Sequence, residues 1–556
     1  MSKNMKSEAE VSRRDFLKGA GAAAAGAAAI GLTGASGVSA FGSEVSTKAS
    51  WMPATWDYET DVLVVGHGFA GQATVITACK EGKDRVMVID VAPEGLDGGT
   101  SSICGQVMMT STSAEGAFTY QKWCNEPYKV DDEDLRSWAE GIVYNLEWLT
   151  DLGINMELNE RLTPEWPEAP SADTIKIYCV DGRSENSVLY LALKEVEEEL
   201  DFESLNNTRA RRLIFDPETK EVFGVIAEQD GKEITIKATK GVMLACGGFE
   251  NNREMMNTYY NSIGVSPIIP EGTPYNMGDG VLMGQEIGAA LWHMNSFASV
   301  RYACQACGED NPASLATFGT KAFIYVGPDG TRPVLEEWHS SSRHGKIYNH
   351  GVWTDIYCPT PAHAIFNQET FESAPILKSS GRGWAAVHMD VPKTNQEAMD
   401  KGLIVKADTI GELAEKIGVD EAALTSTLTN YNKYCEDQYD PEWHRGQGLE
   451  RGFSTFQDLS QQAAGGATAG FELIPINPPY YAMKLVACNI NNQGGPKRNS
   501  RSEVLDIFDK PIPRLYSGGE MGAIYPYKYN AGGDIAEGLY NGRVAGRNII
   551  ALEPWE

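Results

Sequence analysis

The sequence predicts an α/β fold with a parallel sheet, and three features of residues 61–90 support that prediction. Residues 62–65 form an unbroken apolar run, which is typical of a strand buried on both faces. A second apolar run, 86–89, ends in the carboxylate of Asp90. Between the runs, three glycines have the spacing G-x-G-x-x-G: Gly66, Gly68 and Gly71. A strand, glycine turn, helix and second strand ending in an acid predict a Rossmann-like domain that binds a dinucleotide.

The residues of this turn have separate physical roles. The first glycine permits a tight bend, the second lets backbone approach a pyrophosphate, and the third lets the helix pack against the strand. Phe69 and Ala70 then lie at the helix N-terminus, where the helix dipole favours phosphate. The Asp90 carboxylate can accept hydrogen bonds from ribose hydroxyls. A glycine-rich turn that binds nothing is the alternative, and the two strands and the acid argue against it.

The N-terminus carries an export signal. Residues 12–18, Ser-Arg-Arg-Asp-Phe-Leu-Lys, match the twin-arginine pattern and precede a Gly/Ala-rich segment with a small-residue cleavage site at 38–40. A transmembrane anchor is the alternative, but Ala and Gly dominate the segment and Leu is scarce. We expect a signal peptide over residues 1–40, a linker over 41–56, and no stable membrane span after cleavage. The expected location is the periplasm or the outer face of the cytoplasmic membrane.

Charge and length narrow the classes of function. The formal net charge of −29 disfavours nucleic acid as a partner, because an acidic surface repels phosphate. The acidity suits a meeting with a basic electron carrier, and a solvated acidic face without a partner is an open alternative. About 510 residues remain after cleavage, more than one hydrophobic core usually serves, so we expect two domains.

The ten cysteines do not have the spacing of a disulfide framework or an iron-sulfur cluster. Cys304 and Cys307 form the one C-x-x-C, and no histidine follows them, so a c-type haem attachment site is not predicted. The pair is interpreted as ordinary loop cysteines, with a redox pair or half of a metal site as alternatives. No metal site is predicted.

Further glycine-rich segments follow the first turn in a set order. Residues 98–102 read Gly-Gly-Thr-Ser-Ser, 241–249 read as a strand ending in Gly-Gly-Phe, and 515–520 precede a glycine-rich helix start at 531–539. In order and spacing they resemble the flavoprotein superfamily of soluble fumarate reductases, urocanate reductases and 3-ketosteroid dehydrogenases. Residues 207–210 and 278–280 match its pattern too, and the resemblance covers nearly all of the mature chain. It implies non-covalent FAD as the cofactor.

The resemblance implies a split Rossmann-like FAD-binding domain, residues 57–298 and 486–556, with an inserted α+β substrate-capping domain at 299–485. It adds a set of FAD contacts to those of the first turn: Gly99, Thr100, Ser101, Ser102 and Gly105 on the flavin side, Ala210 at the adenine, Gly247 and Asp279, Glu520 at the ribityl chain, and Gly533, Ile535 and Ala536 at the isoalloxazine ring. No haem or flavin-carrier domain is visible. Electrons are therefore expected from a separate donor, such as a cytochrome or a quinol-linked protein.

The chain departs from the family at the substrate. Fumarate reductases grip a dicarboxylate with two histidines and two arginines, because a dianion needs charge-assisted partners. Here Val300 falls at the first histidine, and Ile-Asn-Asn-Gln-Gly-Gly at 490–495 replaces the second. Asn530 falls at the carboxylate-binding arginine, and the proton-donating arginine aligns near Phe371. These departures argue against fumarate and weaken the case for urocanate.

Tyrosines stand where those residues are missing. Tyr525, Tyr527 and Tyr529 precede the flavin-facing Gly533, and Tyr525-Pro resembles the Tyr-Pro of ketosteroid dehydrogenases. Three extra residues separate it from the glycines, so Tyr529 competes for the role, and an ordinary packing loop is the other interpretation. The implied chemistry is hydride transfer between flavin N5 and a carbon β to a carbonyl. A tyrosine then exchanges a proton at the α carbon, and the Gly533 amide stabilises the enolate.

The predicted function is reduction of an activated C=C bond in a small enone-like or steroid-like acceptor. The alternatives are a 3-ketosteroid-type dehydrogenase working in the oxidising direction, and a non-catalytic flavin electron carrier. In the inserted domain, Arg332 and Glu336 are interpreted as a structural ion pair over a proton relay. His339, Arg343 and His344 form a polar run that either reaches the substrate or lies in a solvated loop.

Overall fold

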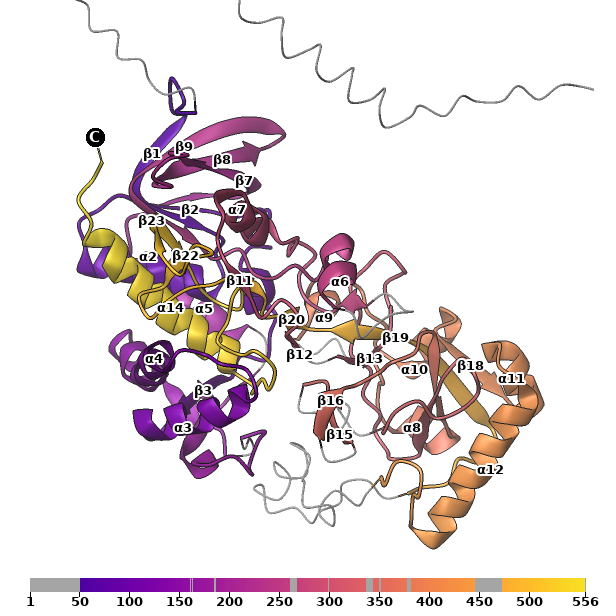
Figure 1. Ribbon diagram of the computed structural model, residues 1–556. Helices are drawn as coiled ribbons and strands as arrows, with labels where there is room; N and C mark the ends of the chain where they lie inside the picture. The colour runs from indigo at the N-terminus through magenta and orange to yellow at the C-terminus, as the bar shows by residue number, and fades with distance from the viewer. Residues whose placement is uncertain are drawn as a thin grey trace, which may run out of the picture. The chain divides into compact units, whose positions relative to one another are not determined.

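The apolar run at 62–65 ends strand β1 (Tyr58–Val65), which lies inside an eight-stranded sheet in the computed structural model (Figure 1). The strand order is β22-β23-β9-β1-β2-β6, and β7 and β8 extend it from β9. The structure describes residues 51–555 except 161, 163, 185–186, 261–267, 299, 337–343, 350–351, 378–381 and 446–472, so the signal peptide lies outside the described residues. The other strands of the sheet are β2 (Val86–Ile89), β6 (Glu203–Leu205), β7 (Thr208–Phe215), β8 (Val222–Gln229), β9 (Lys232–Leu244), β22 (Glu503–Leu505) and β23 (Pro511–Ser517).

The centre of this sheet is parallel, as the apolar runs predict. β1 pairs in parallel with β2, Val62 opposite Val86, and with β9 on its other side. β23 pairs in parallel with β9, so a strand from the C-terminal segment completes a sheet begun at the N-terminus. The carboxyl ends of β1, β2 and β9 therefore meet at one edge, where ligands bind in open α/β sheets.

Two helices lie side by side across one face of the sheet (Figure 1): α2 (Phe69–Glu81) and α14 (Gly533–Ile550). Small residues permit this close approach, because a Cβ on Gly542 would lie 2.3 Å from the carbonyl oxygen of Ala70. The N-terminus of each helix points toward the ligand edge of the sheet. Beside them lie α3 (Ala114–Asn125), α4 (Asp132–Asp151), α5 (Val188–Glu197) and the three-stranded sheet of β3 (Met108–Ser111), β4 (Met156–Leu158) and β5 (Ile175–Val180).

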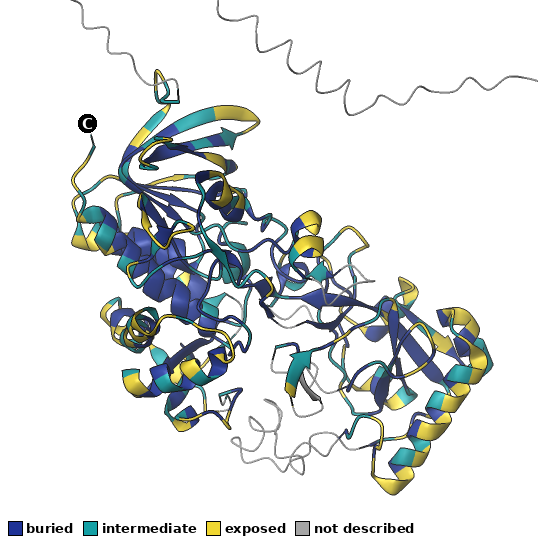
Figure 2. Ribbon diagram, in the orientation of Figure 1, coloured by how far each residue is buried: buried dark blue, intermediate teal, exposed yellow. Residues whose placement is uncertain are grey.

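A second sheet lies in the inserted segment, and its long strand β19 (Tyr480–Asn489) pairs with four others. Those are β10 (Ile269–Pro270), β13 (Arg301–Ala303), β17 (Ala362–Phe366) and β18 (Ile404–Ala407), and β14 (Phe323–Val326) pairs with β17. Its helices are α8 (Gln368–Ser373), α9 (Trp384–His388), α10 (Asn395–Asp400), α11 (Ile410–Ile417) and α12 (Glu421–Asp437). The exposed faces of α11 and α12 contrast with the buried strands of both sheets (Figure 2).

The remaining elements are short. They are the 3₁₀ helices η1 (Gly99–Ser102) and η2 (Ala172–Thr174), helices α6 (Arg253–Tyr259) and α7 (Asp279–Ile287), and the strand pairs β11 (Leu291–Trp292) with β21 (Gly495–Pro496), β12 (Phe297–Ala298) with β20 (Asn491–Asn492), and β15 (Lys346–Asn349) with β16 (Val352–Asp355). The β15–β16 hairpin belongs to the inserted segment.

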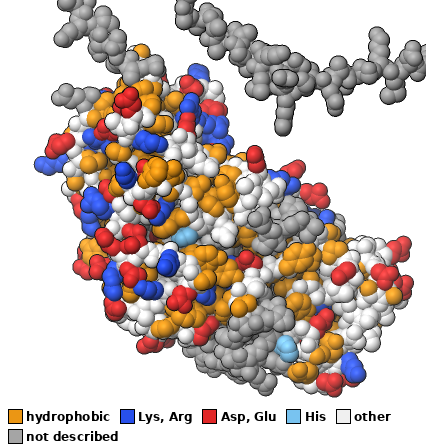
Figure 3. Space-filling view, in the orientation of Figure 1, with side chains coloured by type: hydrophobic (Ala, Val, Ile, Leu, Met, Phe, Trp, Pro, Cys, Tyr) orange, Lys and Arg blue, Asp and Glu red, His pale blue; other side chains and the backbone are white. Residues whose placement is uncertain are grey.

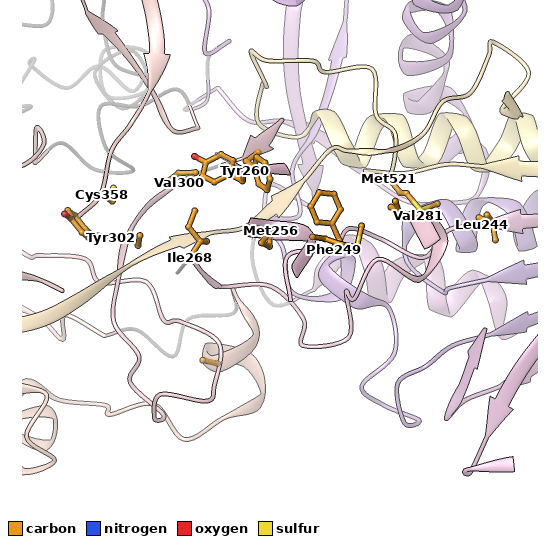
Figure 4. Packing of buried hydrophobic residues seen from close by; sticks show 14 of the residues in the cluster. Leu244, Phe249, Met256, Tyr260, Ile268, Val281, Val300, Tyr302, Cys358 and Met521 are labelled. Atoms are coloured by element: carbon orange, nitrogen blue, oxygen red, sulfur yellow. The ribbon is translucent and has the colours of Figure 1, made fainter. Parts of the chain in front are cut away.

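One hydrophobic core continues from the first sheet into the second. It includes Leu244 at the end of β9, Phe249 and Tyr260 in the connection, and Tyr302 and Cys358 in the inserted segment, which form a continuous row in Figure 4. The residues from Ser50 onward accordingly form one compact unit. Because the two sheets share this core, residues from both of them line the cavity described below.

Acidic and basic side chains are interspersed over the face shown in Figure 3. Within the described residues, no helix is both long enough and apolar enough to cross a membrane. The same residues contain no group of three or more His, Cys, Asp or Glu side chains arranged to hold a metal ion. Cys304 is buried and Cys307 half-buried, both are free thiols, and burial raises the pKa of each.

Candidate functional site

A cavity of about 1210 Å³ lies at the carboxyl ends of β1, β2 and β9 and extends to the inserted segment. Most of the predicted cofactor residues line it: Gly66, Gly68, Phe69, Ala70, Asp90, Gly99, Thr100, Ser101, Gly105, Ala210, Gly247, Asp279, Glu520 and Ile535. Four predicted residues do not line it: Gly71, Ser102, Gly533 and Ala536. Segments far apart in the sequence therefore converge on one cavity.

The first glycine turn forms one end of the cavity. Gly66 has φ +100°, and a Cβ there would lie 2.3 Å from the carbonyl oxygen of Ala245, so both backbone conformation and space demand glycine. A Cβ on Gly71 would lie 2.1 Å from the Gly66 carbonyl oxygen, which explains why Gly71 packs behind the turn and does not face the cavity. Asp90 accepts the His67 amide at 2.9 Å, and burial raises the pKa of its carboxyl.

His67, between the first two glycines, anchors a buried charge cluster. Its Nε2 lies 3.0 Å from a Glu197 oxygen, and its Nδ1 lies 3.4 Å from Asp97 and 3.1 Å from Lys194 Nζ. Burial lowers the pKa of His67, but the Glu197 and Asp97 carboxylates outweigh burial and raise it to about 9. A positive charge on His67 is therefore held beneath the glycine turn, where the pyrophosphate of a dinucleotide is expected. The G-x-G-x-x-G pattern did not predict His67, because this residue occupies an x position, where any side chain fits the pattern.

The loop at 98–102 forms the next part of the wall. Its helix η1 begins after Gly98, whose φ is +93°, and the Phe69 amide donates to Ser101 Oγ at 3.1 Å. This hydrogen bond joins the loop to the N-terminus of α2. Ser102 turns away from the cavity and donates through Oγ to the Gly99 carbonyl oxygen at 2.9 Å.

Buried carboxyl groups joined by amides line the middle of the cavity and its far end. Asn491 Nδ2 donates to Asp534 at 2.6 Å and to Glu520 at 2.7 Å, and Asn276 Nδ2 donates to Glu250 at 2.7 Å and to Glu520 at 3.1 Å. Burial, with the nearby Glu250 and Asp534 charges, raises the pKa of Glu520 well above its usual range. Burial also raises the pKa of Asp534 to about 6. Asn491, which the sequence alignment places at a family histidine, thus donates to two carboxyl groups.

The three predicted catalytic tyrosines take different positions. Tyr529 lines the cavity, and the Asp534 amide donates to its hydroxyl oxygen at 3.3 Å. Tyr525 lies behind it, fully buried beside Trp138, with no hydrogen-bond partner of ordinary geometry among the described residues for its hydroxyl. Tyr527 donates to the Trp353 carbonyl oxygen at 3.0 Å and lies outside the cavity lining. The alternating positions do not place all three on one face.

The predicted oxyanion donor, Gly533, also needs correction. Its amide donates to the Asn530 carbonyl oxygen at 2.9 Å, so a ligand does not find that donor free. A Cβ on Gly533 would lie 2.7 Å from the Tyr525 hydroxyl, so Gly533 lets that tyrosine pack against the start of α14. Ala536 is fully buried one helical turn further on. Gly532, which precedes α14, and the α14 residues Asp534, Ile535 and Gly538 line the cavity.

Asn530, which the sequence alignment places at the carboxylate-binding arginine, makes structural contacts in this chain. It is fully buried, and its Oδ1 accepts the Tyr120 hydroxyl at 2.7 Å and the Glu165 amide at 2.9 Å. The Glu165 carboxylate accepts the Ala531 amide at 3.3 Å and lines the cavity. The end of the cavity that would carry an arginine thus carries a carboxylate.

Two arginines from the inserted segment line the cavity. Arg301 forms a buried ion pair with Glu271. Arg382 makes no hydrogen bond or ion pair with the described residues, and a Cβ on Gly105 would lie 3.1 Å from its Nη2. Burial and the Arg301 charge lower the pKa of Arg382. Phe371, near which the alignment places the proton-donating arginine, stacks on Tyr481 inside the inserted segment and lies outside the cavity lining.

Sequence reasoning left Glu165, His344 and Arg382 out of the predicted site, and the structure places all three on the cavity wall. The signal for Arg382 is its Gly-Arg-Gly context, since Gly383 has φ +81° and donates its amide to the Ile103 carbonyl oxygen at 2.8 Å. Arg332, in contrast, pairs with Glu336 at 2.6 Å and with Asp440 at 2.9 Å, away from the cavity. His339 and Arg343 lie outside the described residues.

The chain matches two family models. Residues 176–534 match the model described as FAD binding domain. Residues 10–29 match the model described as the twin-arginine translocation pathway signal sequence, which confirms the predicted export route.

Relatives span most of the chain. A digoxin reductase of Eggerthella lenta is 26% identical over 99% of this chain and 98% of its own length. A probable fumarate reductase of Shewanella frigidimarina is 26% identical over 91% of this chain and 79% of its own length. The crystal structure of 3-ketosteroid Δ1-dehydrogenase from Sterolibacterium denitrificans with 1,4-androstadiene-3,17-dione has a TM-score of 0.70 at 21% identity, covering 89% of this chain and 99% of that one. The predicted fold class and the predicted resemblance are confirmed.

Proposed function

Since the chain belongs to the FAD binding domain family, we propose that its cavity holds FAD non-covalently for reduction of a C=C bond conjugated to a carbonyl. The protein is an exported FAD-dependent oxidoreductase that acts on C=C or CH–CH bonds. The observation that supports the substrate class is Tyr529 on the cavity wall, in a position where Asn530 has replaced a carboxylate-binding arginine.

The residues of the cavity fit FAD along its length. The Gly66 turn and the N-terminus of α2 suit the pyrophosphate, and Asp90 at the end of β2 suits the adenosine ribose. Asp534 Oδ1, a buried oxygen with no partner in the described residues, lies at the start of α14, where the flavin ring is expected. Non-covalent attachment is supported by Cys104, whose pKa burial raises to about 11, because a thiol that stays protonated is a poor nucleophile.

Charge at the reacting end disfavours a dicarboxylate. Glu165 and Asp534 both line the cavity near Tyr529, and either would repel a second substrate carboxylate. At the other side, the Arg382 guanidinium, which has no ion-pair partner among the residues that the structure describes, offers hydrogen bonds to one oxygen-bearing group. An enone-like or steroid-like acceptor can accept a hydrogen bond from Arg382 through its carbonyl and brings no negative charge toward Glu165 and Asp534. Fumarate can also bind Arg382, but its second carboxylate would be repelled. The digoxin reductase resemblance supports the reducing direction.

In the proposed reaction, the cofactor and two side chains have separate roles. FAD, when bound, supplies the hydride. Burial, with the Asp534 charge, raises the pKa of Tyr529 well above its usual range, so Tyr529 stays protonated until a carbanion demands its proton. Tyr529 gives that proton to the carbon next to the carbonyl. Arg382 donates to the carbonyl oxygen and stabilises the charge that develops there, in place of the Gly533 amide.

The proposed partners are a small organic electron acceptor and a separate electron donor such as a cytochrome or a quinol-linked protein. The net charge of −29 supports a basic donor, because opposite charges accelerate encounter. No nucleic acid is expected among the partners.

The test is anaerobic reoxidation of chemically reduced holoprotein, followed through the flavin absorbance. The acceptors are fumarate, urocanate and a panel of enones that includes 3-ketosteroids. Rapid reoxidation by an enone, with fumarate inert, is the expected result. Preferential reoxidation by fumarate would overturn the substrate class, and silence across the panel would favour the flavin-carrier alternative. Saturated ketones with an artificial acceptor test the oxidising direction.

A further inference from the structure

The half-buried His344 and the buried Glu165 form a pair beside Tyr529 that the proposed reaction has not used. His344 Nδ1 lies 2.6 Å from Glu165 Oε2, and Glu165 is 1% exposed. The His344 ring meets the Tyr529 ring edge to face, with centroids 4.8 Å apart and planes at 86°. Both members of the pair and Tyr529 line the cavity. Histidine, carboxylate and phenol thus meet at one point of the wall.

Separate parts of the chain hold each member of this pair. Asn530 accepts the Glu165 amide at 2.9 Å, and the neighbouring Trp166 indole donates to the Tyr529 carbonyl oxygen at 2.9 Å. These two bonds attach the Glu165 segment to the tyrosine loop. The position of Glu165 therefore depends on the same Asn530 that replaces the family arginine.

The β15–β16 hairpin carries His344 to this point. Trp353 on β16 meets Trp166 edge to face with centroids 4.9 Å apart, and its carbonyl oxygen accepts the Tyr527 hydroxyl at 3.0 Å. Lys346, two residues after His344, lies 4.3 Å from the centroid of the Tyr527 ring. The hairpin is thus packed against the segments that carry Glu165 and Tyr529, which explains a role for Tyr527 outside the cavity.

Backbone conformation supports a functional role for His344. Its φ is +53°, a left-handed conformation that persists in an ordinary residue where the surroundings impose it. Glu165 accepts from Nδ1, which sets the orientation of the ring. The other ring nitrogen, Nε2, has no hydrogen-bond partner among the described residues and is available to exchange protons.

We propose that His344, oriented by Glu165, returns to Tyr529 the proton that each turnover removes. This inference rests on the proposed function. Reduction of the C=C bond adds a hydride at the β carbon and the Tyr529 proton at the α carbon. The resulting phenolate takes a proton from the His344 imidazolium, which regains one from solvent, while Glu165 holds the ring through Nδ1. His344 acts through Tyr529 and is a positioning and relay residue.

A relay has a physical reason at this site. Tyr529 is buried and its pKa lies well above the usual range, so bulk water is a poor source for its proton. Two titratable side chains are in ring contact with it, Tyr525 and His344, and of these His344 lines the cavity. The Glu165 carboxylate holds the ring as the acid of a catalytic triad holds its histidine.

The test compares His344→Ala and Glu165→Gln holoproteins with His293→Ala. His293 is a matched control, because it also has a positive φ, +54°, and one ring nitrogen 2.6 Å from a backbone oxygen, but lies outside the cavity lining. Enone reoxidation of reduced flavin is expected to slow at least tenfold in His344→Ala and severalfold in Glu165→Gln. Added imidazole is expected to restore most of the rate to His344→Ala only, because the cavity admits it beside Tyr529.

A second readout follows proton exchange without net turnover. Oxidised wild-type holoprotein is expected to exchange the α hydrogen of a saturated ketone product with D₂O, measured by NMR, and His344→Ala to exchange it at least tenfold more slowly. FAD content and thermal midpoint are measured for every variant, so that misfolding is recognised.

The outcomes separate the two proposals. If wild-type protein reacts with no enone, the proposed function fails whatever the variants do. If wild-type protein reacts and His344→Ala keeps its rate and its exchange within twofold, the relay is wrong and the function stands. Loss of rate without rescue by imidazole, with exchange intact, would mean that His344 only supports the fold of the hairpin.

Discussion

The two ends of the cavity are built in different ways. At the nucleotide end, Gly66, Gly68 and Asp90 come from one stretch of strand, turn, helix and strand, and their places follow from backbone geometry. At the proposed reacting end, the side chains come from four segments that lie far apart in the sequence, with strands of the second sheet between them. They are Glu165, His344, Arg382 and Tyr529. A site made of backbone can be read from a short pattern, whereas a site made of side chains depends on how distant segments pack.

The largest effect is expected at the nucleotide end, from Gly66→Ala. The new Cβ would lie 2.3 Å from the Ala245 carbonyl oxygen at a residue with φ +100°, so the turn must distort. We expect loss of nearly all bound FAD, measured as flavin absorbance per protein. The control is Gly153→Ala, where φ is +83° but the Cβ meets open space and only the conformational cost of about 1–2 kcal/mol applies. Equal FAD content in both variants would contradict this account.

The next effect is expected at the reacting end, from Tyr529→Phe. Losing the one phenol on the cavity wall among the three candidates should slow reoxidation by an enone about a hundredfold or more. Tyr525→Phe should keep the rate within threefold, since its hydroxyl has no partner of ordinary geometry in the described part of the chain. Stopped-flow reoxidation measures both. If Tyr525→Phe proved the slower variant, the proton donor would be Tyr525, as the Tyr-Pro resemblance implies, and not Tyr529.

A pH dependence of stability tests the charge cluster at the nucleotide end. The pKa of His67 rises from an ordinary value of 6.5 to about 9, so its contribution is complete below pH 6.5 and is lost as pH rises through 9. The loss is expected to reach up to about 3 kcal/mol in the free energy of unfolding. His67→Gln should remove this slope, measured by denaturant unfolding between pH 6 and 10. His388→Gln is the control, because burial lowers the pKa of His388 and its titration lies below this window. Parallel curves for wild type and His67→Gln would refute the assignment.

The smallest effect is expected from Arg382→Met, and its two parts have opposite signs. Removing a half-buried guanidinium that has no ion-pair partner among the described residues should raise stability by about 1 kcal/mol, seen as a small rise in Tm. The same change should slow enone reoxidation about tenfold, because a donor to the carbonyl oxygen is lost. Arg301→Met is the matched control and should lower Tm, since it leaves the buried Glu271 without its partner. A fall in Tm for Arg382→Met would show that the guanidinium supports the fold.

Most of the fold was predictable because its signals are local. The apolar run of β1, the glycine turn and Asp90 predicted a parallel sheet, and the spacing of the later glycine segments predicted the flavoprotein resemblance, both of which are confirmed. The boundaries of the inserted domain stay a prediction. The shared core that runs from Leu244 to Cys358 shows why they are hard to place, because packing does not stop where the sequence insertion begins.

The reacting end was predicted only in part, and the reasons lie in particular residues. Tyr529 was one of three tyrosines at alternate positions, and nothing in their spacing distinguished the one that faces the cavity. Arg382 lies eleven positions after Phe371, near which the alignment places the proton-donating arginine, so the sequence did not single it out. His344 had no distinguishing pattern, because its partner Glu165 is 179 residues away in the chain.

The sequence alone determined the export signal, the fold class, the cofactor family and the backbone of the nucleotide site, since each rests on residues close together in the chain. Only the tertiary structure decided which tyrosine meets the cavity, that Asn530 positions Glu165, and that His344 and Arg382 reach the same wall. The physical reason is the distance along the chain over which each effect acts. Glycine conformation and helix dipoles act within a few residues, whereas a side-chain constellation exists only after the two sheets have packed around one core.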